Sequence, residues 1–269
     1  MQLEPVATRP RLVPEIHDRS QWHRSFERDG YVLFPGLVDQ AAVAGVHRDI
    51  LTEFERARTS EGLFTGGGSV SGHLNCFPGA PSRAIGDAIE RAGIHDFARS
   101  LSRDPLRLPN VGCNLNLPGS RPQNEHIDGY FAAPFLIVNV ATVDTDLTNG
   151  AMEVLCRTHR RNYKYWQLAW ERPERKRLCL KRGDALLRVS TLWHRGMPNR
   201  SAAARPMLAF TWENGGSTST DPYAAHGGRI VFLPNRYATD FRGRLRERVF
   251  VAAPRASMAL RVVQSLFER

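Results

Sequence analysis

The chain has 269 residues, 42% of them hydrophobic, which is enough to bury the core of a full domain. Its formal net charge of +10 permits anionic partners but does not choose among nucleic acid, lipid and small anions. No apolar run could cross a bilayer, and the N-terminus lacks a basic region followed by an apolar one. We therefore expect one cytoplasmic domain over residues 1–269, without a membrane segment.

The cysteines and the basic residues add two further exclusions. The four cysteines form no C-x-x-C pair, which indicates reduced thiols rather than a zinc or disulfide framework. The run 157–166 (RTHRRNYKYW) is rich in basic and aromatic residues, but a single segment of this kind is typical of a surface loop. The sequence therefore does not favour a nucleic-acid partner.

The N-terminal part predicts helices around one short strand. Trp22 and Phe26, spaced i and i+4, mark a helix with one buried stripe. Asp39 is a plausible N-cap for a helix with apolar residues at helical spacing, and Ser82 is a candidate cap for another. The expected elements are an irregular segment 1–17, a helix 18–28, a strand 31–34, a helix 39–58 and a helix 82–101.

Between these helices, residues 60–82 are rich in Gly, Ser and Pro. Connections of this length without structure of their own tend to be lids or binding loops. Within this loop, His73 and Asn75 are among the polar groups most able to meet a substrate. A glycine-rich surface loop with one exposed histidine explains the same residues.

The middle of the chain predicts strands. They are expected at 106–117, 135–143, 151–156, 177–190 and 205–212, with an insertion at 157–176 and a C-terminal helix at 254–269. Asn116 shares a strand face with Asn114, so it could hydrogen-bond a ligand in a barrel interior or satisfy buried loop backbone. Asn139 interrupts the most hydrophobic strand and needs a partner, because an unpaired buried amide costs about 1–3 kcal/mol. The C-terminal helix is expected to pack on the barrel, or else to form a dimer contact.

One short motif suggests a metal site. His126 and Asp128 lie two residues apart, so on an extended strand both side chains point the same way. Together they supply two of the three ligands of the 2-His-1-carboxylate triad that holds non-haem Fe(II). An H-x-D motif alone is weak, since an ordinary surface pair has the same pattern. Tyr130, two residues further along, would share this face and could close the site together with the 60–82 loop.

A second segment completes the site. His194 follows a strand-like run and enters a loop, which makes it the candidate third ligand. Arg205 opens the next strand, where its guanidinium could clamp a carboxylate through two hydrogen bonds. Arg195 should point to the opposite face, and Arg200 lies in an exposed turn. This layout is the one that a 2-oxoglutarate site requires.

These ordered blocks resemble the phytanoyl-CoA dioxygenase family of Fe(II)/2-oxoglutarate oxygenases over roughly residues 20–215. They are 26–36 (FERDGYVLFPG), the H-x-D motif, 149–155 (NGAMEVL) with 158–159, 183–184, His194, 198–201 (PNRS) and Arg205. The resemblance implies a mainly β fold with flanking helices, a double-stranded β-helix or cupin-like jelly roll. It also implies Fe(II) at His126, Asp128 and His194, with 2-oxoglutarate and O2 as co-substrates.

The resemblance further assigns the carboxylate-binding arginine to Arg205 and places Asn139 in the lining of the 2-oxoglutarate site. Two departures stand out. The chain has Cys156-Arg157-Thr158-His159 where the family usually has Pro-Gly-Ser-His or Pro-Gly-Thr-His, and Asn139 where members often have an aromatic residue.

The expected function is oxidation of an unactivated C–H bond in a small-molecule metabolite, with hydroxylation as the leading reaction. The carboxylate of Asp128 argues against halogenation, since halogenating members of the family lack it. An oxidative cyclase, desaturase or epimerase of a natural product would use the same centre. A non-catalytic jelly-roll binding protein could keep the same scaffold, and a zinc-dependent cupin hydrolase or isomerase could use the same ligands. We expect a monomer or homodimer.

Overall fold

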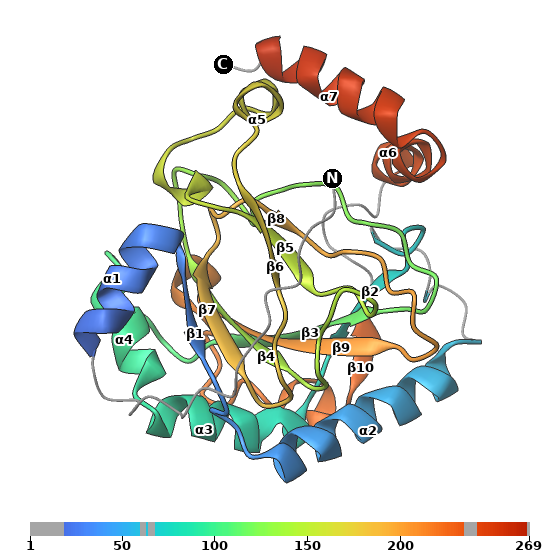
Figure 1. Ribbon diagram of the computed structural model, residues 1–269. Coiled ribbons are helices and arrows are strands. Elements are labelled where there is room, and N and C mark those ends of the chain that lie inside the picture. Colours follow the sequence, from blue (N-terminus) through green and yellow to red (C-terminus); the bar gives the residue numbers. More distant parts are fainter. Residues whose placement is uncertain (1–18, 60–62, 64–67, 234–240, 268–269) are drawn as a thin grey trace.

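The computed structural model describes residues 19–59, 63, 68–233 and 241–267. The predicted leading segment 1–17 therefore lies outside the described residues. Figure 1 shows two sheets facing each other, with helices below the larger sheet and further helices at the opposite end. This is the predicted jelly roll with flanking helices, and the fold prediction is confirmed.

The large sheet contains seven antiparallel strands in the order β1-β7-β4-β9-β3-β2-β10. Their bounds are β1 Tyr31–Phe34, β7 Ala185–Val189, β4 Leu136–Ala141, β9 Arg205–Thr211, β3 Asn110–Asn116, β2 His73–Phe77 and β10 Val231–Leu233. The small sheet has the order β6-β5-β8, with bounds β6 Arg175–Leu178, β5 Met152–Leu155 and β8 His194–Arg195.

Four helices cover the outer face of the large sheet (Figure 1). They are α1 Arg19–Asp29, α2 Gln40–Ala57, α3 Arg83–Arg91 and α4 Ile94–Leu101. Alternate strand residues such as Val138 and Val140 pack against these helices in the main apolar core. The residues between them, including Asn139, face the interior between the two sheets. Strand alternation thus delivers polar side chains to the barrel interior without breaking the outer core.

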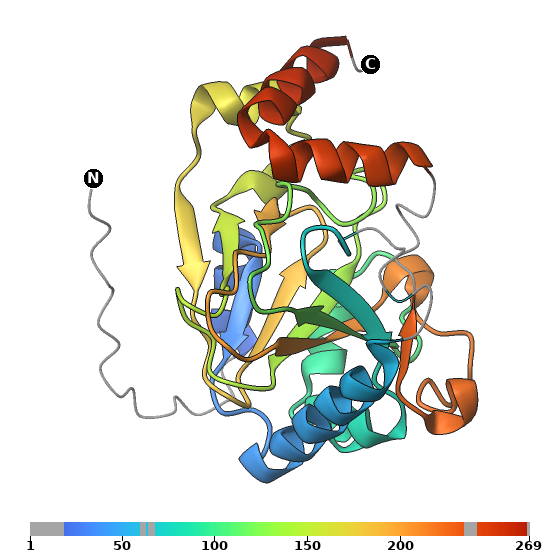
Figure 2. The same cartoon turned by 90° about the vertical axis from the view of Figure 1, so that its right-hand side faces the viewer.

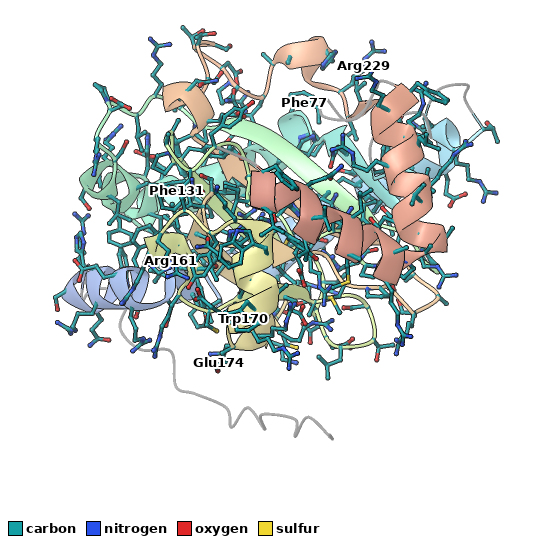
Figure 3. The ribbon with its side chains drawn as sticks, turned by 90° about the horizontal axis from the view of Figure 1, so that it is seen from above. Phe77, Phe131, Arg161, Trp170, Glu174 and Arg229 are labelled. Carbon is teal, nitrogen blue, oxygen red and sulfur yellow. The ribbon has the colours of Figure 1, made fainter. Side chains whose placement is uncertain are left out.

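The helices α5 Tyr165–Glu171, α6 Phe241–Ala252 and α7 Pro254–Phe267 gather at the other end of the barrel (Figure 2). Seen from above, α7 lies beside α5, which carries the exposed Trp170 (Figure 3). The two helices are joined where the backbone N–H of Trp166 donates to Ser265 Oγ at 2.9 Å. The C-terminal helix therefore packs against α5 at this end of the barrel. None of the helices in the described part of the chain is both long and apolar enough to cross a membrane.

Several boundaries differ from the predictions. The expected helix 82–101 is two helices, because Gly93 adopts a left-handed φ of +70° and starts a new one. Ser82 does not cap with its side chain, which instead donates to the carbonyl of Gly79 at 2.7 Å. Asp39 caps α2 as predicted, accepting from the N–H groups of Ala41 and Ala42.

The expected strand 177–190 is also divided. Its first part belongs to β6 in the small sheet and its last part to β7 in the large sheet. A turn at 179–184 separates them, and Asp184 accepts from the N–H groups of Lys181 and Gly36 there. The elements β2, β10 and α6 were not predicted.

Candidate metal centre

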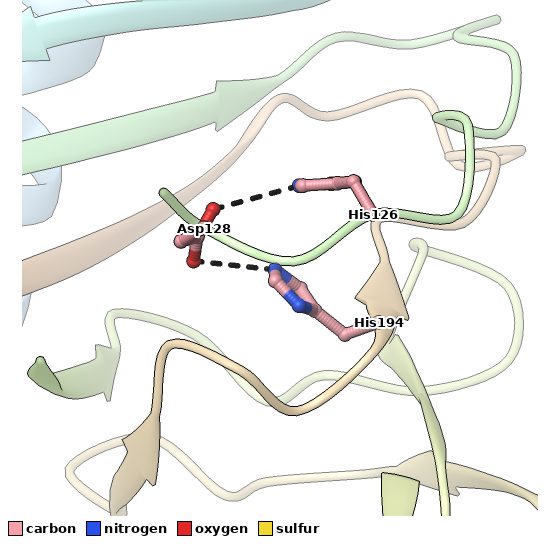
Figure 4. Close-up of side chains that lie close together, drawn as sticks. All are labelled: His126, Asp128 and His194. Atoms are coloured by element: carbon pink, nitrogen blue, oxygen red, sulfur yellow. Dashed lines mark ion pairs between the residues drawn. The ribbon is translucent and has the colours of Figure 1, made fainter. Parts of the chain in front are cut away.

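His126, Asp128 and His194 come together at the end of the barrel. One nitrogen or oxygen atom from each residue lies within 4.8 Å of the others. Asp128 Oδ1 is 3.6 Å from His126 Nε2, and Asp128 Oδ2 is 3.5 Å from His194 Nε2 (Figure 4). The backbones of the two histidines form reciprocal N–H to O=C hydrogen bonds of 3.0 Å. This single bridge joins the loop that carries His126 to β8, and it replaces the regular strand that we expected for the H-x-D motif.

Both imidazoles are oriented as metal ligands. His126 Nδ1 lies 2.7 Å from the carbonyl of Asn124, and His194 Nδ1 lies 2.9 Å from the carbonyl of Leu192. A carbonyl only accepts, so each Nδ1 carries the proton and each Nε2 keeps its lone pair free. Metal-bound histidines in proteins commonly have this outer hydrogen bond.

The charges around the cluster favour the protonation states that a metal needs. Burial lowers the pKa of His194 to about 3, and the charge of Arg188 adds to this effect, so the imidazole is neutral. Burial alone would raise the pKa of Asp128, but Arg188 and the two histidines outweigh it and hold the pKa below its usual range. Arg188 Nη2 lies 2.7 Å from Asp128 Oδ2. The cluster thus offers a neutral imidazole at His194 and an ionised carboxylate at Asp128.

This donor set fits a non-haem iron ion. Two ligand atoms that are each about 2 Å from one metal, as nitrogen ligands are from zinc, lie about 3 to 4 Å apart. The measured separations of 3.5 and 3.6 Å agree with that geometry. Two imidazoles and one carboxylate leave coordination positions open, as non-haem Fe(II) oxygenases require.

Arg205 is a buried cation without a buried anion. It is only 5% exposed, and it donates from Nε to the carbonyl of Asn149 at 3.2 Å and from Nη2 to the carbonyl of Gly150 at 3.1 Å. Burial lowers its pKa to about 10, and no carboxylate of the described residues pairs with it. A charge buried among neutral partners is costly unless an ion of opposite sign joins it. Arg205 therefore fits a site for an anionic ligand.

The other two arginines of this region differ from Arg205 as predicted. Arg195 is paired with Glu153, at 2.7 Å from Nη2 to Oε1, and its charge is already balanced. The side chain of Arg200 is exposed in its loop. Only Arg205 among these three combines burial with an unbalanced charge.

The two predicted asparagines have clear partners. Asn139 Oδ1 accepts from Arg188 Nε at 3.0 Å, so the buried amide has the partner that it needs. Asn116 donates to the carbonyl of Met197 at 2.9 Å and accepts from Ser120 Oγ at 2.5 Å. Asn116 is fully buried and serves loop packing, the second of the two roles expected from its place in the sequence. A co-substrate role for either residue stays a prediction.

The expected lid residues do not lie where we placed them. His73 starts β2 and is 2% exposed, because its ring is packed inside with Nε2 at 2.9 Å from the carbonyl of Arg121. Asn75 is on the same strand and accepts from Asn114 Nδ2 at 3.1 Å. The alternative interpretation, a surface loop with one exposed histidine, is therefore wrong. Part of the 60–82 loop lies outside the described residues, and the substrate contacts stay predictions.

Tyr130 does not share a strand face with Asp128. Gly129 has a left-handed φ of +72°, which reverses the chain after Asp128 and ends the extended geometry. The Tyr130 side chain is 81% exposed. The alternation argument for Tyr130 is wrong for this reason, and its contact with a substrate stays untested.

Sequence reasoning missed Arg188. It lies on β7 and is 5% exposed, and it contacts both Asp128 and Asn139. The signal was present, since an arginine in the apolar strand 185–189 needs a partner as much as an asparagine does.

A family model for phytanoyl-CoA dioxygenase (PhyH) matches residues 26–207. The chain belongs to the phytanoyl-CoA dioxygenase family. The predicted enzyme class, with iron and 2-oxoglutarate, is confirmed by this membership together with the His-Asp-His cluster.

Solved structures of similar fold agree with this membership. The epimerase SnoN from nogalamycin biosynthesis is 22% identical, with 72% of this chain and 82% of SnoN covered and a TM-score of 0.53. The carbocyclase SnoK from the same biosynthesis is 16% identical, with 71% and 82% covered and a TM-score of 0.55. HygX from Streptomyces hygroscopicus, with nickel and 2-oxoglutarate bound, is 15% identical, with 71% and 85% covered and a TM-score of 0.51.

Proposed function

We propose that this member of the phytanoyl-CoA dioxygenase family oxidises a C–H bond of a small-molecule metabolite, with hydroxylation as the leading reaction. In this proposal His126, Asp128 and His194 hold Fe(II), and Arg205 binds the distal carboxylate of 2-oxoglutarate. The observation that carries it is the coexistence of three convergent ligand atoms with a buried, unpaired guanidinium on the neighbouring sheet.

The residues of the chain have three tasks in this reaction. The carbonyls of Asn124 and Leu192 fix the two imidazoles with Nε2 toward the metal. The carbonyls of Asn149 and Gly150 hold the guanidinium of Arg205 in one orientation, so it would bind the distal carboxylate of 2-oxoglutarate in one position. This charge-assisted bond would contribute about 1.5–3 kcal/mol. Iron bound there would supply oxygen activation coupled to decarboxylation of 2-oxoglutarate.

The barrel interior supports the third task, exclusion of water. An apolar cluster between the two sheets includes Leu186 and Met207 from the large sheet and Val154 from the small one. A dry interior limits side reactions of the oxidising centre.

The decisive experiment combines purified protein, Fe(II), 2-oxoglutarate and O2 with panels of candidate metabolites. Succinate release that depends on one metabolite, together with a product that gains one oxygen atom, would support hydroxylation. Absence of 2-oxoglutarate turnover with every metabolite and absence of 2-oxoglutarate binding would contradict the proposal. The variant His126→Ala serves as the control for iron-dependent turnover.

A second candidate is a natural-product cyclase, desaturase or epimerase with the same centre. It is favoured by the similarity in fold to the epimerase SnoN and the carbocyclase SnoK. Product mass separates the reactions, because cyclisation and desaturation remove two hydrogen atoms and epimerisation leaves the mass unchanged. The same assay therefore decides between the two candidates.

A further inference from the structure

A second buried arginine, Arg188, contacts the proposed metal ligand Asp128 and lies on the same large sheet as Arg205. Arg188 comes from β7, whereas Arg205 opens β9, and β4 lies between them in the sheet. Arg188 faces the interior because its strand neighbours Leu187 and Val189 pack toward the outer core. The two guanidinium groups thus approach the interior from different strands.

Two of the three nitrogens of Arg188 have defined partners. Nη2 lies 2.7 Å from Asp128 Oδ2, and Nε donates to Asn139 Oδ1 at 3.0 Å. Asn139 in turn donates toward the carbonyl of Leu208 at 3.4 Å, so the amide is held with its oxygen toward Arg188. These contacts fix the plane of the guanidinium.

The third nitrogen, Nη1, is buried and has no hydrogen-bond partner anywhere in the described parts of the chain. Nη1 shares the planar, rigid guanidinium with Nη2, the nitrogen that contacts Asp128. A buried donor without a partner costs free energy unless a ligand satisfies it. Nη1 is thus an unused donor on the side chain that holds the proposed ligand Asp128.

The charges point to an anionic ligand. Asp128 balances the charge of Arg188, but the same carboxylate is a proposed metal ligand. A divalent ion would leave the cluster with excess positive charge in a buried environment. A carboxylate placed next to the metal would restore the balance and accept from Nη1.

We propose that Arg188 binds the carboxylate adjacent to the keto group of 2-oxoglutarate through Nη1, while Nη2 holds Asp128. This inference rests on the proposed function and deepens it. It divides the recognition of the co-substrate between two arginines, with Arg205 on the distal carboxylate and Arg188 on the carboxylate at the chelating end. It also gives the unusual Asn139 a role, since its amide orients Arg188.

The test compares two ligands that differ in one group. 2-Oxoglutarate carries both carboxylates, whereas 2-oxobutanoate keeps the 2-oxo acid end and lacks the distal carboxylate. Their Kd values are measured by calorimetry without oxygen on protein loaded with Mn(II). The variants are Arg188→Met, Arg188→Lys and Arg205→Met, with Arg200→Met as the matched control because its side chain is exposed.

Arg188→Met should weaken both ligands by about 10- to 150-fold, the range for one charge-assisted hydrogen bond. Arg205→Met should weaken 2-oxoglutarate by a similar factor and leave 2-oxobutanoate unchanged. Arg188→Lys keeps a buried cation but loses the planar guanidinium that donates to two partners at once. Its Kd values should therefore fall between those of wild type and Arg188→Met. Arg200→Met should match wild type.

Mn(II) affinity is measured on the same proteins to separate ligand binding from support of Asp128. Unchanged Kd values in a folded Arg188→Met protein would overturn the inference while leaving the proposed function intact. So would a loss confined to Mn(II) affinity, because Arg188 would then only position Asp128. If wild-type protein loaded with Mn(II) binds no 2-oxoglutarate, the proposed function itself fails. Should Arg188→Met not fold, the Arg188→Lys protein gives the same comparison.

Discussion

Arg261 of helix α7 donates a hydrogen bond of 2.7 Å from Nη2 to the backbone carbonyl of Glu125, the residue before the proposed ligand His126. Its Nη1 also donates to Asn124 Oδ1 at 3.3 Å, and the guanidinium lies over the Tyr165 ring at 3.8 Å. The carbonyl of Asn124 is the acceptor that orients His126. The C-terminal helix, which lies beyond the matched family region, therefore supports the segment that carries a ligand.

Arg261→Ala should lower Mn(II) affinity by about 10-fold, in the range seen when outer-shell partners of metal ligands are removed. The physical reason is that His126 loses the fixed backbone that sets its ring. Arg255→Ala is the control, since Arg255 is exposed on the same helix. Metal titrations that give equal affinities for both variants would show that α7 does not support the site.

Replacing a proposed ligand should have a larger effect. His194→Ala removes a buried nitrogen and leaves one imidazole and one carboxylate, too few for the triad. The variant should lose stoichiometric Fe(II) after gel filtration, as measured by metal analysis, and lose turnover with it. His47→Ala, on the outer helix α2, should keep both. Full iron content in folded His194→Ala would refute the ligand assignment.

The role of Arg205 can also be tested through the turn at Asn149 and Gly150, whose backbone carbonyls hold its guanidinium. Gly150 has φ +86°, and an added Cβ would lie 2.4 Å from Asn116 Nδ2 and 2.5 Å from the carbonyl of Met197. Gly150→Ala should therefore shift the carbonyl that holds Arg205 and raise the Kd for 2-oxoglutarate, with little change in metal affinity. Gly119→Ala is the matched control, since Gly119 also has a positive φ but its Cβ would meet no atom within 4 Å. Equal Kd values for the two variants would argue against a role of this turn in co-substrate binding.

The chemistry of the site could be predicted because it depends on residue types at fixed places in a known order. His126, Asp128, His194 and Arg205 were all expected, and the structure brings the first three together. What could not be predicted depends on register and on single backbone angles. Arg188 and Asn139 are 49 residues apart and meet only through the pairing of β4 with β7.

Tyr130 and β2 are two features for which the sequence prediction was wrong. One glycine with a positive φ turned Tyr130 outward, and no periodicity in the side chains records that angle. The strand 73–77 contains no β-branched residue and follows a glycine-rich stretch, so local propensity favoured a loop. Pairing with β3 and β10 decides its conformation, and those contacts are remote in sequence.

The buried His73 predicts a pH dependence of stability. Burial lowers its pKa to about 4 from the ordinary 6.5, so below pH 6.5 the unfolded chain binds a proton that the folded protein does not. Stability is therefore retained above pH 6.5 and falls as the pH drops toward 4. This one group should cost about 2 kcal/mol between pH 7 and pH 5.

His73→Gln removes the titration and can still donate to the carbonyl of Arg121, which accepts from His73 Nε2 at 2.9 Å. The free energy of unfolding is measured with urea at pH 7 and pH 5 for metal-free wild type, His73→Gln and His23→Gln. His23 lies half-buried on α1 and serves as the control. We expect the loss on acidification to be smaller in His73→Gln than in the other two proteins by about 2 kcal/mol. Equal losses in all three proteins would mean that His73 takes up its proton in the folded state without difficulty, and that the interior around β2 admits water.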